Sequence, residues 1–321
     1  MGSRLTRALG IVGAGLAAGG GVLAAANRLL LLDDLPPTLP GAMHDWSWQG
    51  WRVRYTTMGE GPPLVLVHGV HAAASSFEMR NVFDPLSRRH TVYAVDLLGF
   101  GKSERPAAPY TGTLYRDLLG AFLGEVVGRP AVVMASSLSA AYAVGAARSR
   151  PSLVAGLVLI SPTGTTSTGS VGPVRQIVGV TFGLPLVGSA AFNLLVCEAS
   201  IRWYLGRAYA DRAMVDETLV GQQWATSHQP NARLAPAAFV AGRLDLPWSD
   251  DASAVSAPIL VLRRTVGGIG TIAGNDELRR LGPNVTIQTI EGTGQLPHDE
   301  APDRVIEIVE AWLSGDERAS R

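Results

Sequence analysis

The sequence predicts an α/β fold built on a mostly parallel, doubly wound sheet. Short apolar runs recur along the chain and end on small or polar residues, at 63–69, 91–99, 130–136, 156–162 and 258–264. Continuous apolar runs of this length are typical of parallel strands buried on both faces. Helical patterns lie between them, at 114–128, 139–151 and 301–315. This alternation is the βαβ rhythm of a doubly wound sheet.

Two further runs, 51–59 and 284–292, alternate apolar and polar residues and predict strands, the second near a sheet edge. The alternation of strand and helix patterns stops at 163–250, where the patterns are helical. We therefore expect a helical lid at 163–250 between two parts of one core, 47–162 and 251–316, and a polar tail at 317–321. The aromatic residues of this lid either line a lipophilic pocket or form its own packing core.

The composition excludes several classes of partner. Lys+Arg and Asp+Glu both number 27 among the 321 residues, so no net charge favours nucleic acid. No C-x-x-C or Cys/His cluster indicates a metal, and the single cysteine, Cys197, excludes an intramolecular disulfide. We expect no cofactor.

Residues 1–32 predict a membrane anchor or a signal-like segment. Residues 8–26 carry no charge, and at about 1.5 Å per residue they nearly cross a ~30 Å hydrocarbon core. Arg4 and Arg7 precede this run, so a retained single-pass anchor leaves the N-terminus cytoplasmic and the main domain outside. The alternative is a signal peptide cleaved before Asn27 and a secreted domain. The proline-rich stretch 33–46 predicts a tether.

Three motifs follow predicted strands in order: "VHG" at 67–69, "DLLGFGKS" at 96–103 and "MASSLSAA" at 134–141. Their succession resembles the α/β-hydrolase fold superfamily over residues 50–316. The family carries its nucleophile on a sharp turn flanked by small residues. The turn here reads Ala135-Ser136-Ser137-Leu138-Ser139, which places Ser137 in the nucleophile position. The alternative is a buried serine in an ordinary turn.

The resemblance also implies where an oxyanion would bind. In this family, the donors are two backbone N–H groups, here those of Leu138 and Val70. A second set of family positions is structural and carries no chemistry, because glycines permit tight turns and a carboxylate fastens the loop. This set comprises His68, Gly69, Asp96, Gly99 and Gly101.

The sequence departs from the family at the base and at the acid. The family's histidine loop corresponds to "EGTGQLPHDE" at 291–300, but Gln295 stands in the histidine position. A glutamine amide cannot accept the serine proton at neutral pH. Positions 265–269, where the family acid is usual, hold no carboxylate, and Asp276 comes too late. Another base could be His298, after a loop shift, or His228 in the predicted lid.

Two hypotheses of function follow. The first is a membrane-anchored, catalytically degenerate homologue that binds an apolar ligand or a membrane-protein partner. The second is a serine hydrolase of small or lipophilic carboxylic esters that uses Ser137 with a non-standard base. The missing acid and base favour the first hypothesis, and the retained Ser137 and "VHG" loop favour the second.

Overall fold

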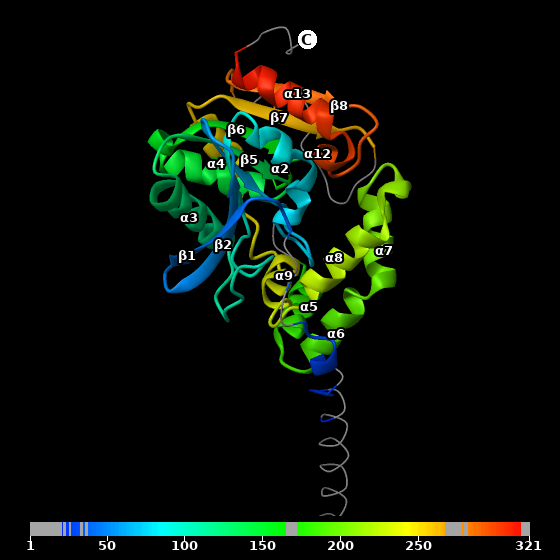
Figure 1. The fold of residues 1–321 in the computed structure, drawn as a ribbon. Helices are drawn as coiled ribbons and strands as arrows, with labels where there is room; N and C mark the ends of the chain where they lie inside the picture. The colour runs from blue at the N-terminus through cyan, green and yellow to red at the C-terminus, as the bar shows by residue number, and fades with distance from the viewer. Residues whose placement is uncertain are drawn as a thin grey trace, which may run out of the picture.

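A computed structural model describes residues 21, 24–25, 27–32, 35, 38–164, 172–266, 278 and 282–315. Its core is one eight-stranded sheet with the order β1-β2-β4-β3-β5-β6-β7-β8 (Figure 1). The strands are β1 Ala42–Trp48, β2 Trp51–Met58, β3 Pro63–Val67, β4 Thr91–Val95, β5 Ala131–Ser136, β6 Val154–Ile160, β7 Ile259–Arg264 and β8 Val285–Ile290.

The first two strands pair antiparallel with their neighbours, and β3 to β8 are parallel. Every residue of β3 is buried, as expected for a strand covered on both faces. The predicted strands and the edge position of β8 are thus confirmed.

The edge strand β1 is a difference from the sequence analysis. Its first residue, Ala42, falls inside the stretch 33–46 that we expected to be an irregular tether. The strand pairs with β2 along its whole length, and five of its seven residues are exposed. A mostly exposed edge strand lacks the apolar run that marks the central strands, so its sequence gives a weak signal.

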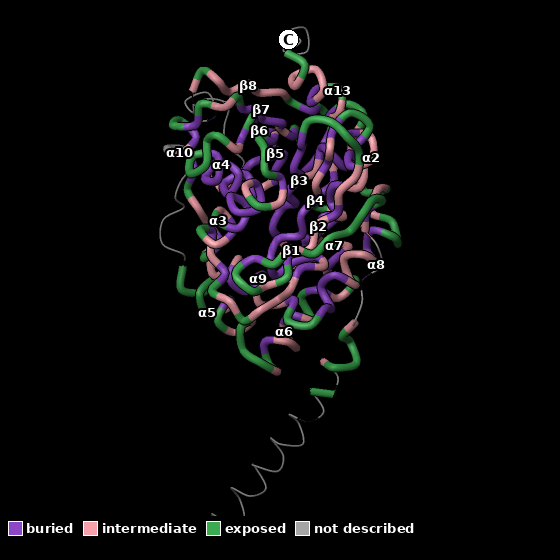
Figure 2. Tube along the Cα trace, turned by 60° about the vertical axis from the view of Figure 1, so that its left-hand side comes forward, coloured by how far each residue is buried: buried purple, intermediate pink, exposed green. Residues whose placement is uncertain are grey.

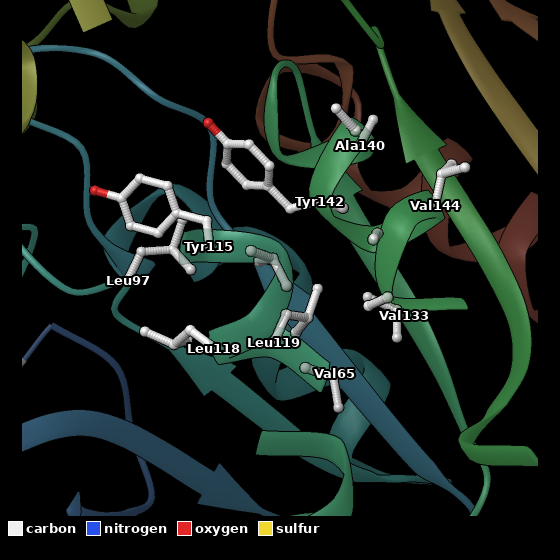
Figure 3. Close-up of a cluster of buried hydrophobic side chains, with 14 of the residues drawn as sticks. Val65, Leu97, Tyr115, Leu118, Leu119, Val133, Ala140, Tyr142 and Val144 are labelled. Atoms are coloured by element: carbon white, nitrogen blue, oxygen red, sulfur yellow. The ribbon is translucent and has the colours of Figure 1, made fainter. Parts of the chain in front are cut away.

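Helices cover both faces of the sheet. One face is covered by α3 Gly112–Phe122 and α4 Ser139–Ser149, and α3 continues as a π-helical turn, η2 Leu123–Val127. The other face is covered by α2 Arg80–Ser87 and α13 Pro302–Leu313. Figure 3 shows the first layer, where Tyr115 and Tyr142 pack among Leu118, Val133 and Val144. The hydroxyls of these two tyrosines donate to the carbonyl oxygens of Leu98 (2.9 Å) and Leu244 (3.0 Å).

The chain between β6 and β7 forms a helical insertion. Its helices are α5 Pro173–Gly183, α6 Val187–Leu195, α7 Glu198–Ala208, η4 Arg212–Met214, α8 Glu217–Ser227, α9 Leu234–Val240 and α10 Ser249–Ser253. Three short helices complete the fold: η1 Ser76–Met79, η3 Pro151–Leu153 and α12 Pro297–Glu300. Helices α5 to α9 of the insertion lie apart from the sheet, and its outer helices carry many exposed residues (Figures 1 and 2).

In the described part of the chain, no single helix has the length and apolar character needed to cross a bilayer. Helices α5 and α6 meet that requirement only as a pair, which is bent by 111°. Residues 1–20, on which the predicted anchor mainly depends, lie outside the described residues.

Candidate active site

Ser137 lies at the sharp turn between β5 and α4. Its φ of 52° is in the left-handed region, which costs a residue with a side chain about 1–2 kcal/mol. Two backbone hydrogen bonds hold the turn, from Ser137 N to Ile160 O (2.8 Å) and from Thr163 N to Ser137 O (3.4 Å). The hydroxyl of Ser137 lies 3.5 Å from that of Thr163.

One expected oxyanion donor, Leu138, directly follows Ser137, and the other, Val70, follows Gly69, where an added Cβ would lie 3.4 Å from Cβ of Ser137. Val70 and Leu138 are buried, and neither backbone N–H donates a hydrogen bond to another residue that the structure describes. His68 lies beside them but uses both ring nitrogens: Nδ1 donates to Gly69 O (2.6 Å), and Nε2 accepts from Leu97 N (3.1 Å). His68 is therefore a structural residue.

Asp96 fastens the loop that follows β4. Its carboxylate accepts from the backbone N–H groups of Ser76 (2.6 Å) and Lys102 (2.9 Å). A Cβ at Gly101 would lie 2.2 Å from the carboxyl group of Asp96, and a Cβ at Gly99 would lie 2.7 Å from the ring of Tyr110. Only glycine fits at either position, since both also have a positive φ.

The loop that carries the family histidine is held in place, with glutamine in the histidine position. Gln295 is buried and donates its backbone N–H to Ala208 O in the insertion (2.6 Å), but its side-chain Oε1 has no hydrogen-bond partner. Thr265 and Val266 donate their N–H groups to Thr293 O, so the end of β7 lies beside this loop. Neither residue is a carboxylate, and Asp276 lies outside the described residues.

The structure adds a residue that the sequence analysis missed. Glu78, in η1, is buried, and its Oε2 accepts from Gly69 N (3.0 Å). A Cβ placed on Gly69 would lie 3.2 Å from that Oε2 and 3.4 Å from Cβ of Ser137. The carboxylate therefore lies next to the nucleophile turn. The only sequence signal is an acidic residue between Phe77 and Met79, shortly after the "VHG" loop.

His298 and His71 approach this carboxylate from two sides. Nε2 of the fully buried His298 lies 3.4 Å from Oε1 of Glu78, without aligned hydrogen-bond geometry, and Nε2 of His71 lies 4.0 Å from Oε2. His71 stacks on Tyr204 of α7, with ring centroids 5.8 Å apart. The fold thus brings His298 to a carboxylate beside Ser137, but no described histidine hydrogen-bonds to the Ser137 hydroxyl.

These contacts set the charges in the cluster. Burial alone would raise the pKa of Glu78, but His298 and then His71 outweigh it and lower that pKa to about 2. Burial lowers the pKa of His71 to about 4, against the opposing attraction of Glu78. At neutral pH, Glu78 is therefore an anion and His71 is neutral.

Buried polar atoms without aligned hydrogen bonds recur in the elements around the nucleophile turn. Ser161 Oγ, Gln295 Oε1 and His298 Nδ1 have no hydrogen-bond partner, and Glu78 Oε1, Ser136 Oγ and His298 Nε2 form a buried group without aligned hydrogen bonds. Ser161, the residue after β6, also has a positive φ, of 42°. Buried polar atoms are paired in most proteins, so a cluster of exceptions indicates a functional site.

Two other features of the region are structural. Asp299 is buried among Arg80 (2.6 Å), Asn81 (2.6 Å) and the hydroxyl of Tyr209, which together fix α12 to α2 and to the insertion. His228 donates through Nδ1 to Trp224 O (2.7 Å) and stacks on Trp224. Among the described residues, no group of three or more His, Cys, Asp or Glu side chains could hold a metal ion.

Comparison with known proteins identifies the family. A model of the "Alpha/beta hydrolase family" matches residues 64–308, so the chain belongs to that family. An uncharacterised protein of Mycobacterium tuberculosis is 24% identical over 89% of this chain and 84% of its own length. A 2-(acetamidomethylene)succinate hydrolase of Mesorhizobium japonicum is 24% identical over 79% of this chain and 89% of its own length.

Solved structures show the same fold. A serine hydrolase involved in carbazole degradation has a TM-score of 0.70 at 20% identity, covering 86% of this chain and 99% of that one. A membrane phospholipase A has a TM-score of 0.68 at 21% identity, covering 98% and 99%. These likenesses support the fold, and the role of each site residue stays a prediction.

Proposed function

We propose that this protein hydrolyses lipophilic carboxylic esters, with Ser137 as the nucleophile and the Glu78–His298 pair as its acid–base group. The cluster of unpaired buried polar atoms around a strained serine carries this proposal. Each such atom costs about 1–3 kcal/mol. Unpaired polar atoms only destabilise a site whose role is packing. At a site that binds polar reacting groups, the same atoms can bind the substrate or take part in the reaction.

Each group has a defined part in the reaction. His298 takes the hydroxyl proton of Ser137 while Oγ attacks the ester carbonyl carbon, and the N–H groups of Val70 and Leu138 stabilise the oxyanion. His298 returns the proton to the leaving alkoxide, and water then releases the acyl group by the same route. Glu78 stabilises the imidazolium, in the manner of a triad carboxylate.

The His298 ring has to approach Ser137 for the first step. In this structure, the Ser137 hydroxyl faces Thr163, and the His298 ring nitrogens have no aligned partner that would hold them in place. Catalytic hydrogen bonds are often long in free enzymes and shorten when substrate binds. The proposed reaction therefore requires the buried imidazole to reorient around Glu78 when substrate binds.

The N-terminal segment supports both the proposed location and the proposed ester class. The uncharged run at 8–26 supports attachment to a membrane, with the folded domain outside the cytoplasm. A membrane enzyme encounters lipophilic esters in its own surroundings. The similar membrane phospholipase A supports the same substrate class.

A second function is a catalytically degenerate member that binds an apolar ligand or a membrane-protein partner. Two observations favour it: Gln295 stands in the histidine position, and the Ser137 hydroxyl faces a hydroxyl instead of an imidazole. In that case, Glu78 and His298 form only a buried structural pair.

Labelling of the full-length protein by a fluorophosphonate probe in mild detergent separates the two functions. We expect labelling of the wild type that Ser137→Ala abolishes and that Glu78→Gln or His298→Gln slows at least tenfold. His90→Gln is the matched control, because His90 forms a similar pair with Glu310 of α13 (3.1 Å), and the contacts given for the Ser137 turn include neither residue. Absence of labelling in the folded wild type overturns the proposal and favours the degenerate member.

A further inference from the structure

Most exposed large apolar side chains in the described part of the chain lie at one end of the molecule. This end is formed by α5, α6 and the N-terminal helical residues, far from the sheet (Figures 1 and 2). We call the group the apolar end face; it comprises Leu29, Leu30, Leu31, Val174, Ile177, Val180, Leu184, Val187, Leu194 and Leu195.

Helix α5 directs an apolar stripe outward. Val174, Ile177, Val180 and Leu184 recur at the spacing of one helix face, and each is between 48% and 71% exposed. Another side of the helix packs on α9, where a Cβ on Gly179 would lie 2.6 Å from Cβ of Ala241. The helix is thus fixed by a close small-residue contact, and the stripe has no packing role in the described chain.

Helix α6 connects the apolar end face to the candidate active site. Leu194 and Leu195 are exposed, whereas Phe192 and the following Val196 are buried against Ala72. Ala72 belongs to the loop that carries Val70 and His71. Helix α6 therefore contacts the loop that holds one oxyanion donor.

The N-terminal segment reaches the same end of the molecule. Asn27 donates to Leu186 O (3.1 Å) and accepts from the Asn193 amide (2.9 Å), which places the helix beside α6. The uncharged run 8–26 leads into this helix, so a membrane-bound N-terminus brings the apolar end face to the membrane. Between 173 and 197, the only charged residue is Arg175, and Arg28 follows the uncharged run.

We propose that the apolar end face docks on a lipid bilayer, with α5 and α6 lying in its surface. Neither helix is long enough to cross a bilayer alone, and an exposed apolar stripe on a helix is typical of helices that lie in a membrane interface. The docked bilayer then adjoins α6, which contacts the loop of Val70. The proposed docking does not depend on the proposed hydrolysis, because the apolar end face is exposed whether or not Ser137 reacts.

Depth-dependent fluorescence tests the docking in the full-length protein. In a Cys197→Ser background, an environment-sensitive dye is attached at Ile177→Cys or Leu194→Cys, with Met43→Cys as the matched control. Met43 is also an exposed apolar residue, but it lies on β1. The protein is added to phosphatidylglycerol/phosphatidylethanolamine vesicles that contain nitroxide-labelled acyl chains, and aqueous iodide serves as the opposing quencher.

We expect lipid nitroxide to quench the dyes at 177 and 194 several-fold more than the dye at 43, and iodide to show the reverse order. Equal behaviour of the three dyes overturns the proposal and leaves the N-terminal segment as the only membrane contact. Protection from iodide without quenching by lipid also overturns it, because a second copy or the chain's own N-terminal segment then covers the face. Fluorophosphonate labelling of the same preparations reports separately on Ser137.

Discussion

The carboxylate of Glu78 and the imidazole of His298 face each other at 3.4 Å, although the two side chains are only 5% and 0% exposed. An anion in such surroundings is costly unless a partner compensates it. The partners here are His298, His71 and the N–H of Gly69, and all of them lie close to the turn of Ser137. The Glu78–His298 pair therefore affects both the stability of the fold and the candidate active site.

Replacing Glu78 should change how stability depends on pH. The folded pKa of about 2 lies below the ordinary value of 4.5, so the unfolded chain binds more protons between these values. The stabilisation is complete above pH 4.5 and is lost as pH falls through about 2; it amounts to roughly 3 kcal/mol. We expect Glu78→Gln to be less stable than wild type at pH 7 and to lose less on acidification, as measured by urea unfolding from pH 7 to pH 2.5.

The control for this experiment is Glu310→Gln, which removes the partner of His90 but leaves the Glu78 cluster intact. It should still lose the stabilisation that Glu78 supplies as the pH falls toward 2.5. Parallel stability curves for wild type and Glu78→Gln would show that Glu78 is not held as a buried anion.

Restoring the family residues should create activity by the ordinary route. Val266 and Gln295 belong to neighbouring loops, since Val266 N donates to Thr293 O (3.0 Å). We expect Gln295→His combined with Val266→Asp to raise the rate of fluorophosphonate labelling at Ser137 at least tenfold, because a positioned base contributes about 10²–10⁴-fold.

The matched variant, Gln295→Asn combined with Val266→Asn, keeps polar groups at both positions but supplies no base. It should label no faster than wild type. If both double variants label equally slowly while remaining folded, the nucleophile turn lacks the geometry for acyl transfer, and the hydrolase proposal loses its support.

The sequence predicted the central strands and the turn of Ser137 because their signals are local. A buried parallel strand is a continuous apolar run, and the nucleophile turn is a short string of small residues. The strand β1 was missed because its mostly exposed residues give no such run.

The Glu78–His298 pair could not be predicted, since only the fold brings η1 and α12 together. From the sequence, Glu78 is one of many acidic residues near a helix start, and His298 required a loop shift to reach the site. The structure places the carboxylate of Glu78 against His298 and next to the Ser137 turn, and His298 itself still has to move to reach Ser137. Such a relation depends on tertiary packing, which short-range patterns do not record.

The buried Asp299 should be important for stability. It accepts hydrogen bonds from Arg80 and Asn81, both at 2.6 Å, and from the Tyr209 hydroxyl. Removing its charge takes away the carboxylate that pairs with Arg80, which is 22% exposed. We expect Asp299→Asn to lower the free energy of unfolding by about 2–3 kcal/mol, measured by urea denaturation at pH 7. Tyr209→Phe, which removes one hydroxyl and no charge, should cost about 1 kcal/mol; equal costs would show that the charge of Asp299 is not important.

Strain at Ser137 gives the last prediction. The φ of 52° disfavours any residue with a Cβ, and glycine adopts this conformation without that cost. Ser137→Ala keeps the Cβ, whereas Ser137→Gly relieves the strain but makes the unfolded chain more flexible. The relief of about 1–2 kcal/mol exceeds the flexibility cost of about 0.4–1 kcal/mol. We therefore expect Ser137→Gly to unfold at a higher urea concentration than Ser137→Ala, while neither variant reacts with the fluorophosphonate. A lower midpoint for Ser137→Gly would show that the turn is not strained in solution.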